Sequence, residues 1–70
     1  MRQNLKQARI EKGMTQQAVA DYLGLKIRSY KYIESGKTHG KIKMWDKLED
    51  LFGINQRELR ANLADLEDSR

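Results

Sequence analysis

Residues 16–34, QQAVADYLGLKIRSYKYIE, decide the fold of this 70-residue chain. Apolar residues at helical spacing lie on both sides of Gly24, and Ala20 lies four residues before that glycine. Two helices that cross near a right angle after a three-residue turn need a small side chain where they approach and a glycine where the turn becomes left-handed. We therefore expect two short helices, one ending at Gly24 and one from about residue 26 to residue 35. A generic glycine turn would explain the glycine but not the apolar positions around it.

The segment before this pair, from about residue 2 to residue 12, carries Leu5 and Ala8 on one helical face. Gly13 ends it, because glycine adopts the left-handed cap conformation without strain. Thr15 is a suitable N-cap for the first helix of the pair, since its hydroxyl oxygen can accept a bond from a free backbone N–H.

The chain after the pair contains two more segments with helical spacing. The first runs from about residue 41 to residue 52, and its apolar stripe consists of Trp45, Leu48, Leu51 and Phe52. The second begins where Asn55 and Glu58 have the spacing of a capping box. The apolar side chains that follow at i, i+4 and i+7 are Leu59, Leu63 and Leu66. Both segments are therefore predicted to be helices.

Length and composition limit the fold to one small domain. The chain has no cysteine, so neither disulfides nor thiolate-bound metal can stabilise it, and stability must come from a tight apolar core. Proline is absent and no alternation of apolar and polar residues predicts a strand. We expect an all-α, compact five-helix domain over residues 1–64, followed by a short C-terminal tail over residues 65–70.

The charge of the chain is unevenly distributed. Residues 1–45 carry ten Lys and Arg against three Asp and Glu, a net charge of +7, whereas residues 46–70 carry four against seven, a net charge of −3. A basic front and an acidic back favour a polyanionic partner, although an ordinary solvated surface has the same composition. No apolar run approaches the roughly 20 residues of a membrane span, and the first residues lack the apolar stretch of a secretory signal. We expect a cytoplasmic protein without a membrane partner.

The order and spacing of several short pieces resemble the phage repressor and Cro-like helix-turn-helix family. The pieces are RIEKGMTQ at 9–16, VA at 19–20, LGL at 23–25, IESGK at 33–37, and FGIN at 52–55 followed by Leu59. The resemblance covers about residues 4–63 and implies a lambda repressor-like DNA-binding fold. The sequence departs from the family at Tyr30, where isoleucine or valine is usual, so altered packing is expected beneath the third helix. It departs again in the loop of residues 38–40, where the common proline is missing.

The resemblance implies that the third helix enters the major groove of double-stranded DNA as a recognition helix. The residues that then fall at or beside base-facing positions are Lys26, Ile27, Arg28, Lys31 and Tyr32. Arg28 is the strongest candidate, because a guanidinium can bond O6 and N7 of guanine together. Ile27 suits a thymine methyl group. Tyr32 can offer its hydroxyl to a base edge, or its ring can simply cover the edge of the core.

A second set of residues is expected to hold the DNA backbone, namely Thr15, Gln16, Ser35, Lys37 and Thr38. Thr15 and Gln16 lie at a helix N-terminus, where free N–H groups and the helix dipole suit a phosphate, although capping alone would explain Thr15. The other three follow the recognition helix. Phosphate contacts of this kind position the protein and carry no sequence information. Lys41 and Lys43 are expected to be solvated.

Arg9 and Glu34 are expected to have a structural role. In the family that the sequence resembles, residues at these places form a partly buried salt bridge between the first helix and the end of the third. Removal of one partner would leave a buried charge unpaired. We therefore exclude both residues from the DNA-contacting set.

The function predicted from the resemblance is that of a bacterial or phage-encoded transcriptional regulator. We expect a repressor that binds a palindromic operator as a homodimer, with Leu63 and Leu66 at the dimer interface because they lie beyond what the core needs. An alternative is an antitoxin or anti-repressor module that acts on a protein partner. Antitoxins often carry a disordered arm, and only residues 65–70 are available for one here.

Catalysis is not expected from this sequence. The one histidine, His39, lies next to a loop glycine and reads as a solvated residue. Ser29 and Ser35 have no histidine placed to activate them. Cysteine is absent and histidine is single, so a metal site lacks ligands. We expect no enzyme activity, no metal, no cofactor and no small-molecule substrate.

Overall fold

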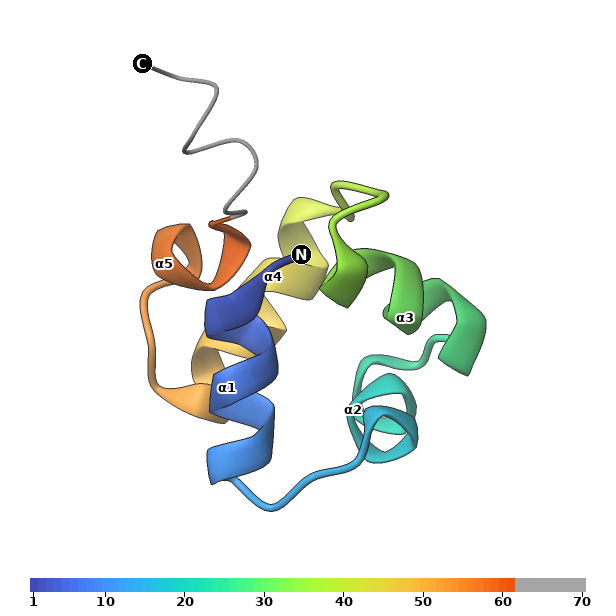
Figure 1. Ribbon diagram of the computed structural model, residues 1–70, viewed down its shortest axis with the longest axis horizontal. Helices are drawn as coiled ribbons and strands as arrows, with labels where there is room; N and C mark the ends of the chain where they lie inside the picture. Colours follow the sequence, from blue (N-terminus) through green and yellow to red (C-terminus); the bar gives the residue numbers. More distant parts are fainter. Residues whose placement is uncertain (62–70) are drawn as a thin grey trace.

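This computed structural model describes residues 1–61, which contain five helices. They are α1 (Gln3–Glu11), α2 (Gln16–Leu23), α3 (Ile27–Ser35), α4 (Ile42–Phe52) and α5 (Gln56–Arg60). In Figure 1, α2 and α3 form one side of the molecule, while α5 lies against α1 and α4 on the other. The described residues contain no strand, so the predicted all-α fold with five helices is confirmed.

The expected caps define the α2–α3 pair. Thr15 Oγ1 accepts a hydrogen bond from Ala18 N at 3.0 Å and so caps α2. Gly24 ends α2 with a φ of 73°, and Lys26 precedes the first residue of α3. The turn between the helices therefore has three residues, as the sequence predicts. Because glycine has no Cβ, it adopts this left-handed conformation without strain.

The core lies where α1, α4 and α5 meet the α2–α3 pair. Its buried apolar residues are Leu5, Ala8, Val19, Ala20, Leu23, Tyr30, Ile33, Met44, Trp45, Leu48 and Leu59. The predicted stripe of α4 is only partly confirmed, since Leu51 and Phe52 are half-buried and Met44 is buried instead. Met44 is covered because its side chain packs closely against Gly40 in the preceding loop.

The last helix is shorter than predicted. α5 ends at Arg60, and Ala61 has extended dihedral angles, with φ −55° and ψ 133°. The Arg60 carbonyl accepts a bond from Arg2 Nε at 3.1 Å. The prediction of one continuous helix through Leu63 and Leu66 is therefore wrong at Ala61. Both leucines, and the expected domain end at residue 64, lie outside the described residues.

The buried carboxylate of Glu34 joins three helices. Arg9 of α1 donates to it from Nε at 2.9 Å and from Nη2 at 3.2 Å, which forms the expected ion pair. Gln16 of α2 donates from Nε2 to Oε1 at 3.2 Å. Tyr30, one turn earlier in α3, donates its hydroxyl to Oε2 at 2.7 Å. This Glu34 cluster therefore fixes the position of α3 relative to α1 and α2.

Tyr30 occupies the position beneath the third helix where the family usually has isoleucine or valine. Its side chain is completely buried, and burial together with the bond to Glu34 raises the pKa of its phenol well above the ordinary value. The phenol thus stays protonated and remains a donor. The hydrogen bond to Glu34 likewise raises the pKa of Arg9. The altered packing expected from the sequence is therefore an added hydrogen bond to a buried charge.

We predict that Tyr30→Phe destabilises the protein. The change removes one donor from a buried carboxylate and leaves the volume of the ring, so the free energy of unfolding should fall by about 2 kcal/mol. Urea denaturation followed by circular dichroism measures this loss. Tyr22→Phe is the matched control, because Tyr22 is 45% exposed. Equal stabilities of the two variants would contradict the role given to the Tyr30 hydroxyl.

Candidate nucleic-acid interface

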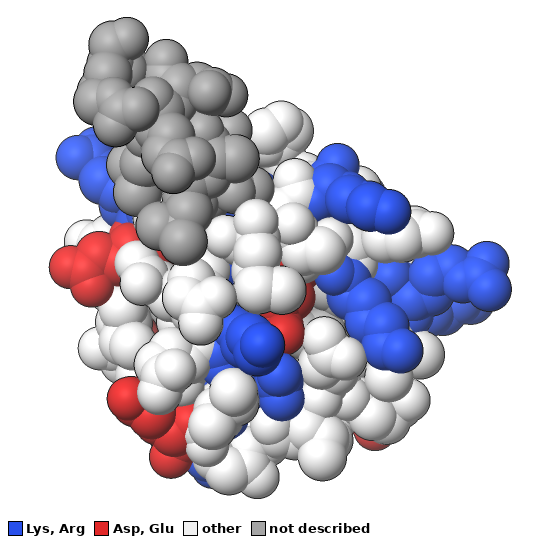
Figure 2. Space-filling model, viewed as in Figure 1, with Lys and Arg blue, Asp and Glu red and all other residues white. Residues whose placement is uncertain are grey.

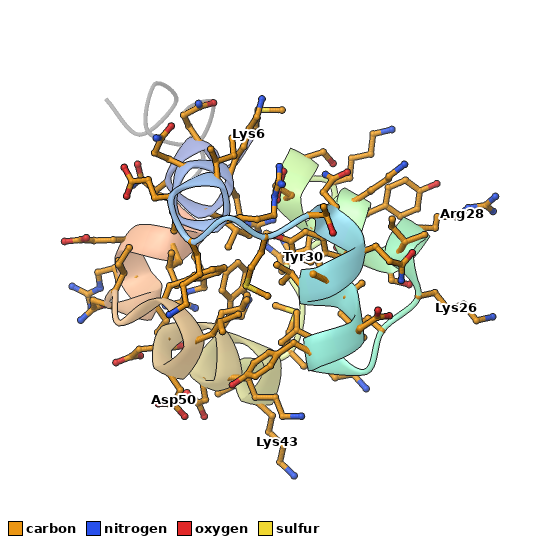
Figure 3. All side chains as sticks on the ribbon, turned by 90° about the horizontal axis from the view of Figure 1, so that it is seen from below. Lys6, Lys26, Arg28, Tyr30, Lys43 and Asp50 are labelled. Carbon is orange, nitrogen blue, oxygen red and sulfur yellow. The ribbon has the colours of Figure 1, made fainter. Side chains whose placement is uncertain are left out.

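α3 has one buried side and one exposed side. Tyr30, Ile33 and Glu34 are buried, whereas Arg28 and Lys31 are exposed. Successive residues of an α-helix are rotated by about 100° about its axis, so residues three or four positions apart share one face. In Figure 3, Arg28 points away from the body of the molecule, while Tyr30 points toward its centre. The Glu34 cluster holds the buried side, so the exposed side is presented outward on a fixed helix.

The structure brings the predicted base-facing residues together on this exposed side. The exposed members are Lys26, Arg28, Lys31 and Tyr32, and Ile27 is half-buried. Lys26 precedes the first turn of α3 and also points outward in Figure 3. Ser29, which was not among the candidates from the sequence, is also exposed next to Arg28. Its position one residue after Arg28 could have indicated it, since a hydroxyl can contact any base edge.

The side chain of Tyr32 is not part of the buried core. It is 43% exposed and borders a hollow of about 320 Å³ between α3 and the start of α4. Lys37 Nζ lies 5.5 Å from the centre of its ring, a cation–π distance. Of the two roles that the sequence allowed for Tyr32, its exposure favours the one at a base or sugar edge.

The charges on the face shown in Figure 2 are unevenly distributed. In Figure 2 most Lys and Arg side chains on the visible face project from the side that α3 occupies. Acidic side chains on this face lie mostly on the side of α1 and α5, with a few near the basic ones. Asp50 of α4 is on the opposite side of the molecule from Arg28 in Figure 3. Lys43 points in a direction different from that of Arg28. The exposed side of α3 is thus the basic face, which suits a polyanion.

The N-terminus of α2 holds the first two predicted phosphate contacts. Thr15 Oγ1 accepts from Ala18 N, and a hydroxyl that accepts one bond can still donate its proton to a phosphate oxygen. The side-chain amide of Gln16 donates to Glu34, so in the free protein it belongs to the Glu34 cluster. Gln16 therefore has a structural contact that the sequence did not predict.

The loop of residues 36–40 follows α3 and contains two of the other candidates. Lys37 and Thr38 are exposed, and their backbone N–H groups donate to the Tyr32 carbonyl at 2.9 and 3.4 Å. Ser35, the last residue of α3, donates its hydroxyl proton to the same carbonyl at 3.0 Å. A phosphate accepts protons, so Ser35 must break this bond to contact one. Lys37 and Thr38 need no such change.

The same loop is held from beneath by two side chains. Trp45 is 2% exposed and donates its indole N–H to the His39 carbonyl at 2.7 Å. Arg2 is 3% exposed and donates from Nη1 to the Thr38 carbonyl at 2.7 Å. Sequence reasoning placed Trp45 in the core, which is confirmed, but gave no role to Arg2. No local pattern could show it, because its partners are carbonyl groups far along the chain.

Other kinds of site find no support among the described residues. Within residues 1–61, no group of three His, Cys, Asp or Glu side chains is arranged to hold a metal ion. None of the helices in this part of the chain combines the length and the hydropathy required to cross a bilayer. His39 is exposed in the loop.

Comparison with known proteins identifies a family and one curated relative. The family model described as helix-turn-helix matches residues 5–59. A curated relative, the SPbeta prophage-derived uncharacterized HTH-type transcriptional regulator YonR of Bacillus subtilis (strain 168), is 36% identical over 53 residues, which are 76% of this chain and 49% of the relative. The chain thus spans about half the length of that relative. No solved structure matches the chain.

We predict that Gly40→Ala destabilises the protein more than Gly53→Ala does. Both glycines have positive φ, 74° and 67°, so alanine strains the backbone at either position. At Gly40 the new Cβ would also lie 2.7 Å from Met44 Cε and 3.2 Å from Trp45 Nε1, whereas nothing lies within 4 Å at Gly53. The extra loss should be about 1 kcal/mol in urea denaturation. Equal losses would show that the loop does not pack tightly on α4.

Proposed function

Because this chain belongs to the helix-turn-helix family of DNA-binding transcriptional regulators, we propose that it reads a specific double-stranded DNA sequence with α3 in the major groove. The observation that carries this proposal is the exposed side of α3. Arg28, Lys31 and Tyr32 project from a helix whose other side is held by the buried Glu34. A reader fixed in this way can offer polar side chains to base edges at defined positions.

The proposed contacts are of two kinds, those that recognise bases and those that bind phosphates of the DNA backbone. Arg28 reads a guanine through two bonds to O6 and N7. The N-terminus of α2 at Thr15 holds a phosphate on one side of α3, and Lys37 with Thr38 holds one on the other. We propose that the protein acts in the bacterial cytoplasm as a repressor, since a small domain that occupies its site excludes other proteins from it.

We predict different effects of Arg28→Ala and Lys37→Ala on DNA binding. Arg28→Ala removes a base contact, so discrimination at one base pair should fall by about 1–3 kcal/mol. Lys37→Ala removes a phosphate contact, so affinity should fall for all sequences and the slope of log affinity against log salt should decrease by about one. Selection of sites from random DNA and fluorescence anisotropy at several salt concentrations measure these effects.

Each variant is the control for the other, because both side chains are exposed and neither should change the melting temperature. Loss of folding in Arg28→Ala would show that the recognition face is misplaced. Absence of duplex binding in the unsubstituted protein would contradict the proposal and favour a module that acts on a protein partner.

We further propose that two copies bind an inverted repeat. One recognition helix covers only about 5 base pairs, and two copies about 34 Å apart on successive major grooves roughly double the binding free energy. The interface proposed from the sequence contains Leu63 and Leu66, which lie outside the described residues. They remain the candidates because apolar side chains beyond Leu59 can form a self-complementary patch.

We predict that a Leu63→Asp, Leu66→Asp double variant binds a palindromic site without cooperativity. Charged side chains at a paired apolar seam repel each other and remain solvated, so each copy should bind its half-site alone. Sedimentation on and off DNA measures the stoichiometry, and Ile10→Asp is a control because Ile10 is 50% exposed on α1. Unchanged cooperativity in the double variant would place the interface elsewhere.

A further inference from the structure

Arg2 is the most buried charged side chain of the described residues apart from Glu34, yet it has no place in the proposed reading surface. Its guanidinium donates to three backbone carbonyls, those of Ile33, Thr38 and Arg60. Its backbone N–H donates to the Glu34 carbonyl at 2.9 Å. The guanidinium also lies 5.3 Å from the centre of the Trp45 ring. One residue thus joins the start of the chain to α3, to the following loop and to α5.

Three of these four acceptors lie at the C-terminal end of a helix, since Ile33 and Glu34 are in the last turn of α3 and Arg60 is the last residue of α5. The Ile33 carbonyl also accepts a bond from the Gly36 backbone N–H at 3.2 Å. The C-terminal end of a helix also favours a positive charge. α3 has no basic residue in its own last turn. Arg2 supplies that charge from a distant part of the chain.

The bond to Thr38 extends this support to the loop of residues 36–40. The Thr38 carbonyl is held by Arg2, and the next carbonyl, that of His39, is held by Trp45. The loop has no proline to restrict its backbone, so its shape depends on such contacts. Lys37 and Thr38 therefore project from a loop whose carbonyl side is fixed from within the domain.

We propose that Arg2 is a positioning residue for DNA binding, which holds the loop of residues 36–40 so that Lys37 and Thr38 meet a phosphate beyond the C-terminal end of α3. The inference rests on the proposed function. Arg2 does not touch DNA in this account, because its guanidinium is buried against backbone carbonyls and Trp45. A fixed loop contributes affinity because less conformational freedom is lost when the phosphate binds.

A double-mutant cycle tests this role. Arg2→Met keeps an unbranched apolar chain and removes every guanidinium bond, and we expect duplex affinity to fall about tenfold with a salt slope smaller by about one. Lys37→Ala should then have almost no further effect in the Arg2→Met background. Independent, additive losses would overturn the proposal, since a merely structural Arg2 would leave the Lys37 contact intact in the folded molecules.

Controls separate this role from general stability. Asn4→Ala removes another bond between α1 and α5, from Asn4 Nδ2 to the Glu58 carbonyl at 3.0 Å, and should leave the salt slope unchanged. If Arg2→Met does not fold, Trp45→Phe is the second variant, because it removes the N–H bond to the His39 carbonyl, together with part of the buried ring, and leaves the Arg2 side chain in place. In the Trp45→Phe background, Lys37→Ala should again cause almost no further loss of duplex affinity. A full Lys37→Ala effect in that background would overturn the proposal.

A measurement without DNA distinguishes failure of this inference from failure of the proposed function. Relaxation of backbone ¹⁵N nuclei in residues 37–40 of the free protein should show lower order parameters in Arg2→Met than in the unsubstituted protein and in Asn4→Ala. Unchanged order parameters would overturn the inference whatever the DNA results. If the loop loosens as expected but the unsubstituted protein binds no duplex, the proposed function is refuted and the loop-holding role of Arg2 is upheld.

Discussion

The carboxylate of Glu34 is buried, and a buried charge must be paired and hydrogen-bonded to be tolerated. That requirement brings Arg9 from α1, Gln16 from α2 and Tyr30 from α3 to one point. Apolar burial alone would allow neighbouring helices to slide or rotate a little, whereas bonds to two carboxylate oxygens restrict both movements. The orientation of α3, and with it the direction in which Arg28 points, depends on this cluster.

The end of α3 depends on a second cation. Arg2 donates to the Ile33 and Glu34 carbonyls at the C-terminal end of the helix, while the Glu34 cluster holds the inner side of the same turn. α3 is therefore fixed at its C-terminal half, close to the loop of Lys37 and Thr38. Rigid presentation matters for reading DNA, because base edges differ only in the positions of donors and acceptors within a few ångströms.

Much of the fold could be predicted because its signals are local. Helix periodicity, the cap at Thr15 and the glycine at position 24 act over one or two turns, and the structure has the predicted helices at nearly the predicted ends. The extent of α5 could not be predicted in this way. The spacing of leucines after Leu59 fits a longer helix, but the backbone leaves the helical conformation at Ala61. The Arg60 carbonyl there accepts a bond from Arg2, 58 positions away in the sequence.

The sequence by itself determined the helix-turn-helix pair, the candidate reading residues around Arg28 and the Arg9–Glu34 pair, since these follow from spacing and from resemblance to a family. Only the tertiary structure decided which polar side chains have contacts inside the domain. It placed Gln16 in the Glu34 cluster and gave Arg2 its backbone partners. The physical reason is that backbone carbonyls are present at every residue and carry no sequence signature. Which of them a buried guanidinium meets is set by the packing of the helices.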